Sequence, residues 1–116
     1  MTFDKLKARW QLEAQGQKRE AAARRAALTR AKPLFARFGV RKAVLFGSVA
    51  AGRSRAGSDI DLLVLPLAAA QYWDFKRELE ESLAYPVDLH SQDDDPGFVE
   101  KVLSRGEVIY EDLYEA

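Results

Sequence analysis

The segment at residues 59–65 constrains the fold of this chain more than any other. Its apolar residues are typical of a strand buried in a sheet, yet it carries two carboxylates, Asp59 and Asp61. Side chains two residues apart on a strand point to the same face, so these carboxylates lie together while Ile60 faces the core. Like charges at this spacing repel, and a divalent cation with oxygen ligands, most plausibly Mg²⁺, would offset them.

A second apolar run, at residues 43–46, ends at Gly47 and Ser48 and predicts a buried strand followed by a turn. Backbone N–H groups at such a turn can bind phosphate oxygens, and glycine removes the side chain that would block their approach. Gly47 and Ser48 are therefore candidate phosphate-binding residues, with Arg53 and Arg55 as further candidates. A phosphate cradle beside paired carboxylates predicts a site for phosphoryl or nucleotidyl transfer.

The remaining pattern predicts an α/β (α+β) fold, with a small mixed β-sheet flanked by helices and long helices at the N-terminus. Strong helix formers dominate the first 38 residues. We expect a first helix there that is weakened at Gly16, and a second, from about residue 19 to residue 38, that is interrupted at Pro33. Further elements are expected as strands at 60–65, 87–90 and 108–110 and as helices at 68–84 and 98–103.

Length and composition limit the classes of protein that fit. The 116 residues allow one domain, with residues 1–30 as a helical extension and residues 31–110 as the catalytic core. The absence of cysteine excludes disulfides and thiolate sites, and His90 is the only histidine, so a histidine-rich zinc site is excluded. No apolar run approaches the roughly 20 residues of a membrane helix, and a cytoplasmic location is expected.

The net charge of zero conceals two opposed blocks. Residues 1–42 hold 12 Lys/Arg and 3 Asp/Glu, a balance of +9, and residues 43–116 hold 6 and 15, a balance of −9. The basic block is compatible with a solvated helix face, with a docking surface for a protein partner that includes Arg24 and Arg25, or with nucleic-acid contact. Nucleic acid is the least favoured, since no basic and aromatic pattern for base stacking accompanies it.

The spacing of the carboxylates and the turn resembles a known signature. Gly47-Ser48, ten residues and then Asp59-x-Asp61 is similar to the motif of the DNA polymerase β-like nucleotidyltransferase superfamily. The apolar residues around this motif, at 45–46 and 62–64, resemble its minimal nucleotidyltransferase (MNT) branch. The later Pro86-Val87-Asp88-Leu89 is similar to the strand that carries the third carboxylate of that family.

The resemblance implies a nucleotidyltransferase fold that binds a Mg²⁺–nucleoside triphosphate, with ATP as the expected donor. Gly47 and Ser48 would hold the phosphates, and Asp59, Asp61 and Asp88 would be the catalytic residues and would hold one or two metal ions. An acceptor hydroxyl would attack the α-phosphorus and pyrophosphate would leave. One departure is Val49, because an arginine often follows the Gly-Ser pair in that family; Arg53 or Arg55 could contact phosphate in its place.

The resemblance also suggests a partner. Many MNT proteins are antitoxins encoded beside a HEPN-domain RNase toxin, and some transfer AMP to a tyrosine of that toxin. We therefore expect AMP transfer from ATP to a hydroxyl of a HEPN-domain partner. The alternatives are a non-catalytic module that neutralises its partner by stoichiometric contact, and an enzyme that acts on a small molecule or an RNA. A homo-oligomer is left open, and His90 is expected to support the site rather than bind metal.

Overall fold

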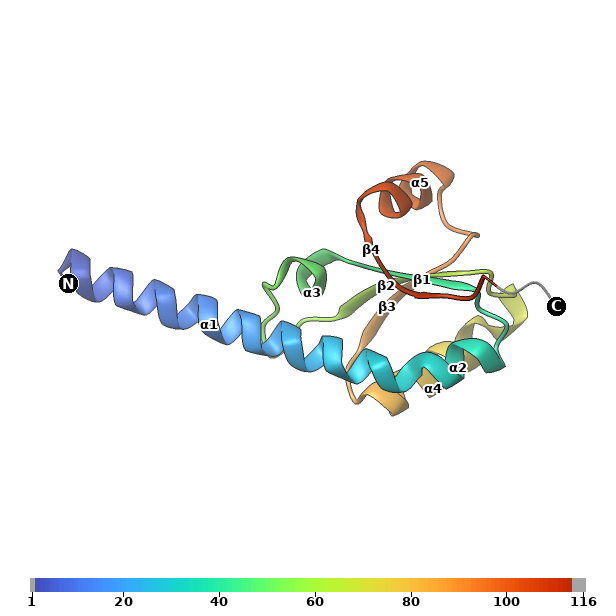
Figure 1. Cartoon of the computed structure of the whole chain (residues 1–116), viewed down its shortest axis with the longest axis horizontal. Helices are drawn as coiled ribbons and strands as arrows, with labels where there is room; N and C mark the ends of the chain where they lie inside the picture. The colour runs from blue at the N-terminus through green and yellow to red at the C-terminus, as the bar shows by residue number, and fades with distance from the viewer. Residues whose placement is uncertain (1, 114–116) are drawn as a thin grey trace.

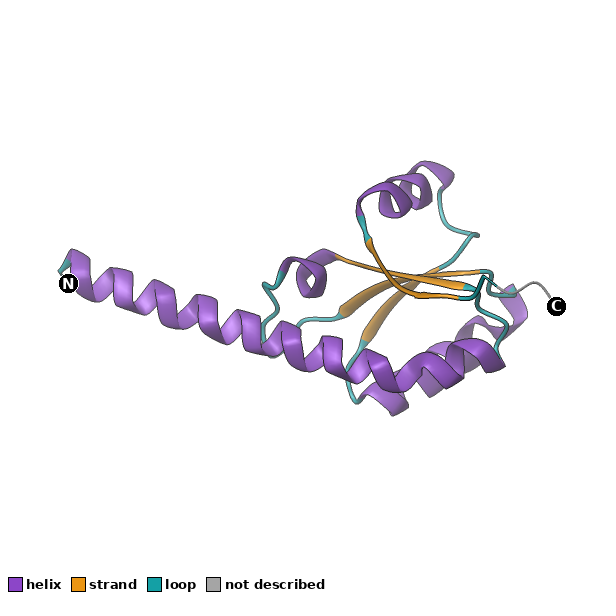
Figure 2. Cartoon of the chain, viewed as in Figure 1, coloured by secondary structure: helices purple, strands orange, loops and turns teal. Residues whose placement is uncertain are grey.

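A computed structural model describes residues 2–113 of the chain and contains one four-stranded mixed sheet (Figure 2). The strands lie in the order β3-β2-β1-β4, and β1 is antiparallel to both of its neighbours while β2 and β3 are parallel. The bounds are Lys42–Phe46 for β1, Ile60–Leu65 for β2, Val87–His90 for β3 and Glu107–Glu111 for β4. The predicted fold class and the predicted strands are confirmed.

Helices cover both faces of this sheet, three of them on one side and one on the other (Figure 1). The first face is covered by α1, α2 and α4, and the second by α5, while α3 follows β1 at the edge of the sheet. The bounds are Phe3–Leu28 for α1, Lys32–Arg37 for α2, Gly47–Ala51 for α3, Tyr72–Leu83 for α4 and Pro96–Arg105 for α5, with 3-10 turns η1 at Thr29–Ala31 and η2 at Ala69–Gln71.

The alternation of side chains along β2 divides the core into two clusters. Ile60, Leu62 and Val64 are buried with the larger cluster, which also contains residues of α1, α2 and α4. Leu63 points the other way and packs with Val102 of α5. Asp61 shares the face of Leu63, because residues two apart on a strand lie on one side. The carboxylate is therefore presented on the α5 face of the sheet.

The N-terminal region differs from the prediction at Gly16. We expected this glycine to weaken the helix, but α1 runs without a break from Phe3 to Leu28. A single glycine costs about 1 kcal/mol in a helix, and the strong helix formers around it outweigh that cost. The interruption near Pro33 does occur, as the η1 turn, because proline lacks the N–H and its ring clashes with the carbonyl four residues earlier.

The first half of α1 extends beyond the body of the domain (Figure 1). All of the buried residues of this helix lie in its second half, from Ala21 onward. Phe3, Trp10 and Leu12 are exposed along the projecting half. Within residues 2–113, no helix is long and apolar enough to cross a membrane.

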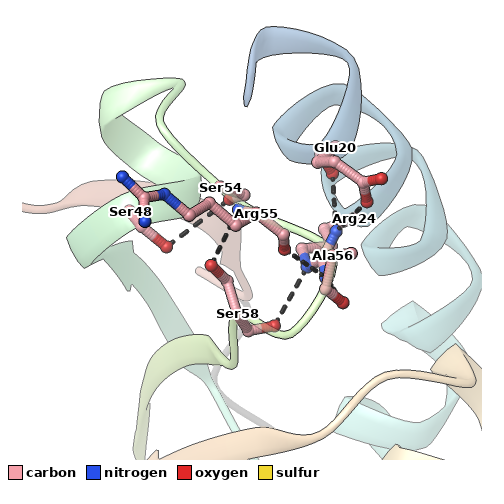
Figure 3. Close-up of polar contacts among 7 residues, drawn as sticks. All are labelled: Glu20, Arg24, Ser48, Ser54, Arg55, Ala56 and Ser58. Carbon is pink, nitrogen blue, oxygen red and sulfur yellow. Dashed lines mark hydrogen bonds and ion pairs between the residues drawn. The ribbon is translucent and has the colours of Figure 1, made fainter. Parts of the chain in front are cut away.

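One arginine of α1 holds the loop between α3 and β2. Arg24 is completely buried, and its guanidinium lies 4.5 Å from the centre of the Tyr85 ring. Figure 3 shows it inserted into the loop. The guanidinium donates hydrogen bonds to the carbonyls of Ser58 (3.1 Å), Glu20 (3.1 Å), Arg55 (2.9 Å) and Ala56 (3.0 Å), and to Oε2 of Glu20 (2.7 Å).

This burial corrects the expectation that Arg24 forms part of a docking surface. The side chain has no exposed area to offer a partner, and its five donors are all directed inward. Arg25 is partly exposed, but it forms an ion pair with Glu107. Neither arginine is therefore free to form the docking surface that the sequence suggested.

Replacing Arg24 should destabilise the domain strongly. Arg24→Met would leave three loop carbonyls without their donor in a buried place, and we expect a loss of about 3 kcal/mol in the free energy of unfolding, measured by urea titration. Arg24→Lys keeps the charge but lacks the planar fork, so it should recover only part of that loss.

The matched control is Arg9→Ala, which removes an arginine from an exposed pair with Glu13 on the same helix. It should change the free energy of unfolding by less than about 0.5 kcal/mol. A lysine variant as stable as the wild type would show that the fork of hydrogen bonds does not hold the loop.

Candidate active site

Asp61 and Asp88 are direct neighbours across β2 and β3. They are register partners in the parallel pair, so their carboxyl groups lie on neighbouring strands of the same sheet. Burial raises the pKa of Asp61 above its ordinary value, and the charges of Asp88 and Asp59 raise it further, against a smaller opposing effect of His90. The pair is thus an acidic cluster short of positive charge.

Asp59 lies immediately before β2 rather than within it, since the strand begins at Ile60. Its side chain is exposed, and its charge acts on Asp61. Within residues 2–113, no three carboxylate or imidazole groups are gathered as a preassembled metal cage. The donor set still fits Mg²⁺, which keeps several waters and takes one or two carboxylates together with substrate phosphates. The assignment of Asp59, Asp61 and Asp88 as metal ligands stays a prediction.

The backbone of Gly47 fits against the carboxylate of Asp61. A Cβ at this position would lie 2.0 Å from Oδ2 of Asp61, and the φ angle is +71°, in the left-handed region. Glycine is therefore required here for two reasons, the close approach and the conformation. The turn after β1 and the acidic pair form one continuous site.

The other residues predicted to bind phosphate differ in how close they lie to Gly47. Ser48 is half-buried, and its Oγ lies 3.5 Å from Oγ of the buried Ser54. Arg53 has an exposed side chain, and its backbone N–H donates to the carbonyl of Ser48 at 2.9 Å. The side chain of Arg55 runs toward Ser48 (Figure 3). The structure thus brings Ser48 together with Gly47, and the side chain of Arg55 runs toward the same turn.

His90 connects Asp88 to a loop carboxylate. Its Nε2 is 3.3 Å from Oδ2 of Asp88, and its Nδ1 is 3.0 Å from Oδ1 of Asp94. The ring lies near Phe46 and Phe98. Burial lowers the pKa of His90, but the hydrogen bonds to Asp94 and Asp88 outweigh this effect, so the pKa is raised overall.

The aspartates at 93–95 lie in the loop between β3 and α5, and two of them make specific contacts there. Asp94 contacts His90 and accepts a hydrogen bond from the backbone N–H of Ser91 at 2.8 Å, and its pKa is lowered despite an opposing effect of burial. Asp95 is the N-cap of α5 and accepts from the N–H of Phe98 at 3.0 Å. An aspartate followed by proline at the start of a helix is a capping signal that could have identified Asp95.

Two cavities border the acidic pair, each of about 480 Å³. One lies between α3 and α5 and reaches Gly47. The other lies at the β3 edge of the sheet, where Asp88 and His90 share its wall with Tyr72 and Trp73 of α4. One cavity thus reaches the glycine that packs on Asp61, and the other reaches Asp88.

Comparison with known proteins agrees with this geometry. Residues 30–114 match the family model described as polymerase beta, nucleotidyltransferase. No curated protein matches the chain. A solved structure of a candidate minimal nucleotidyltransferase is 34% identical, with a TM-score of 0.57 over 78% of this chain and 92% of that one.

Two further structures share the fold at lower identity. A toxin–antitoxin with AMP-PNP gives a TM-score of 0.63 at 22% identity over 73% of each chain. A mutant of the toxin–antitoxin MntA-HpeT gives 0.58 at 21% identity over 70% of each chain. With the family model covering most of the chain and the Gly-Ser turn placed against the Asp61–Asp88 pair, the chain belongs to the polymerase β nucleotidyltransferase family as a protein with a minimal nucleotidyltransferase domain.

Proposed function

We propose that this nucleotidyltransferase moves AMP from ATP to a hydroxyl, specifically a tyrosine hydroxyl, of a HEPN-domain toxin, and acts as its antitoxin. The observation that carries the proposal is the Asp61–Asp88 register pair with Gly47 against it. This pair offers oxygen ligands and negative charge beside a backbone that a phosphate can approach. Such a site suits a charged triphosphate only together with a divalent cation.

In this proposal the chain's own residues have separate tasks. Gly47 and Ser48 bind phosphate oxygens, and Asp59, Asp61 and Asp88 hold Mg²⁺. When bound, Mg²⁺ would neutralise charge on the phosphates and favour the ionised acceptor. The acceptor oxygen forms a bond to the α-phosphorus as the bond to the bridging oxygen breaks. Pyrophosphate leaves with that electron pair, and the proton of the acceptor passes to Asp88.

The cavity at the β3 edge supports a large acceptor. Asp88 lines it, and it is open to solvent beside the exposed ring of Trp73. A tyrosine carried on another protein could reach Asp88 from this side while the donor occupies the Gly47 side. Attack from the side opposite to the leaving group is the geometry that phosphoryl transfer favours.

Two observations support a toxin as the partner: the descriptions of structures with the same fold, and the exposed residues of α1. Two structures with the same fold are described as toxin–antitoxins. The projecting half of α1 exposes Phe3 and Trp10, and exposed aromatic residues are enriched in protein interfaces. This half of the helix is the surface that we assign to the partner.

Transfer can be tested with ATP labelled at the α-phosphate, Mg²⁺ and the protein encoded beside this chain. We expect label on the partner with the wild type and a loss of at least about 100-fold with Asp61→Asn, because that variant loses a charged oxygen ligand. Glu81→Gln removes an exposed carboxylate from α4, away from both cavities, and should transfer normally.

Two results would contradict the proposal. No label on the partner at any Mg²⁺ concentration would remove the enzymatic function. Equal neutralisation of the partner by the wild type and by Asp61→Asn would favour the stoichiometric binding module instead.

Asp61 should destabilise the metal-free protein at neutral pH. Its folded pKa is raised, so protonated Asp61 stabilises the fold at low pH, and this contribution is lost as the pH rises through the folded pKa. We expect Asp61→Asn to melt at a higher temperature than the wild type at pH 7, and the difference to vanish below about pH 4.

The same variant should gain no thermal stability from Mg²⁺ and ATP, although the wild type should. Thermal unfolding with and without both ligands would measure this, with Glu81→Gln again as the control. A wild type that melts at the same temperature as Asp61→Asn at pH 7 would show that the acidic pair carries no repulsion.

Gly47→Ala should abolish transfer because the added methyl group displaces the Asp61 carboxylate. The added Cβ would fall 2.0 Å from Oδ2 of Asp61, so the carboxylate must move, and the φ of +71° adds strain. Gly52 is a matched control, because its φ is also +71° but a Cβ there meets nothing within 4 Å.

Both variants should lose about 1–2 kcal/mol of stability from the left-handed backbone. Only Gly47→Ala should lose transfer, by about 100-fold or more, since a displaced catalytic group has that order of effect. Equal transfer by the two variants, measured at saturating ATP, would mean that the contact with Asp61 is not needed.

A further inference from the structure

The cavity between α3 and α5 has features that the three carboxylates and the Gly-Ser turn leave unexplained. Its volume of about 480 Å³ lies within the range of small-molecule sites. Gly47 forms part of its wall, so it opens directly beside the Asp61 carboxylate. It lies on the α5 face of the sheet, the same face as the acidic pair.

The floor of this cavity is apolar and rigid. Phe46 of β1 and Phe98 of α5 meet edge-on with their ring centres 5.7 Å apart. Val102 behind them is buried in the second core cluster. Ala50 on α3 leaves the opposite wall without a bulky side chain. The flat base of a nucleoside can pack against an apolar surface of this kind.

Two cations line the same cavity. Lys101 and Arg105 are four residues apart on α5 and so lie on one side of the helix. Both are exposed, and neither forms an ion pair with another residue of the described chain. The C-terminal end of α5 favours Arg105 through its dipole, but this does not account for two cations beside an apolar cavity.

The negative charge of the site explains why two cations would be needed beside this cavity. Asp59, Asp61 and Asp88 repel a triphosphate, and the metal offsets only part of the negative charge that the two together bring. Lys101 and Arg105 line the cavity from α5, whereas Gly47 lines it from the start of α3, so the two cations can contact phosphate oxygens in addition to those that the turn binds. Arginine and lysine are the side chains that recognise phosphate best.

We propose that this cavity is the nucleoside triphosphate site, with Lys101 and Arg105 binding the polyphosphate and the Phe46–Phe98 floor receiving the nucleoside. The inference rests on the proposed function and deepens it, because it adds two residues of α5 to the donor site. It concerns binding alone, so it can be tested without a partner protein and without turnover.

The test is equilibrium binding of MgATP, Mg-tripolyphosphate and adenosine to the full chain, by calorimetry. Lys101→Ala and Arg105→Ala should each weaken MgATP and Mg-tripolyphosphate by about tenfold, as expected for one lost charge-assisted contact. Adenosine should bind the variants as it binds the wild type. Higher salt should weaken tripolyphosphate binding to the wild type more than to either variant.

Two controls separate this effect from general changes. Arg77→Ala removes an exposed arginine from α4 on the other face of the sheet, with the same loss of charge. Glu100→Gln alters a neighbouring exposed residue on α5. Neither should change the affinity for MgATP by more than about twofold, and none of the four variants should change the urea midpoint.

The outcomes distinguish this inference from the proposed function. A wild type that binds no MgATP would overturn both. A wild type that binds MgATP while Lys101→Ala and Arg105→Ala bind it equally well would overturn the α5 site and leave the proposed function standing. If the variants lost affinity for adenosine and for tripolyphosphate to the same extent, the cations would not bind the polyphosphate specifically.

Discussion

The buried guanidinium of Arg24 is the interaction on which the geometry of the site depends. Removing a charge from water costs several kcal/mol, and the cost is offset here because each donor finds an acceptor. Three of those acceptors are carbonyls of the loop that leads from α3 into β2. This loop runs directly into Asp59. A helix that lies entirely before the matched family region at residues 30–114 therefore fixes the shape of the loop that leads to Asp59.

The alternation of β2 then determines what the site can do. Ile60 and Leu62 anchor the strand in the core, which forces Asp61 onto the α5 face beside Asp88. Burial among like charges raises the pKa of Asp61, so the metal-free fold carries a repulsion that it does not relieve by itself. This is the expected state of a site that a cation completes, because functional sites are often less stable than the scaffold that holds them. Gly47 makes the arrangement possible by leaving the space that Asp61 occupies.

Local patterns were enough to predict the sheet and the face on which Asp61 lies, since both depend on alternation and on short spacings, whereas Asp88 was assigned from the family resemblance. The strands at 60–65 and 87–90 and the neighbourhood of Gly47 follow from residues close together in sequence. The burial of Arg24 and its contacts with the loop could not be predicted from local patterns. Arg24 lies on the stripe of Ala21 and Leu28, which face the core, but its acceptors are backbone carbonyls more than thirty residues away. The contact of Asp94 with His90 was missed because a run of aspartates has no periodicity that singles out one member. Gly16 was misjudged because its local cost is small against the propensity of its neighbours.

Some of the basic residues in the first half of the sequence form ion pairs with acidic residues of the second half inside the domain. Arg25 pairs with Glu107, and Arg37 pairs with Glu78, so basic residues of the first half meet acidic residues of the second. Arg24 is withdrawn from the surface altogether. Other basic residues stay exposed along the chain, and among them Lys101 and Arg105 of α5 belong to the acidic half of the sequence. A balance of charge along the sequence thus says little about where anions bind. The folded chain sets two cations of its acidic half beside the cavity that we propose as the triphosphate site.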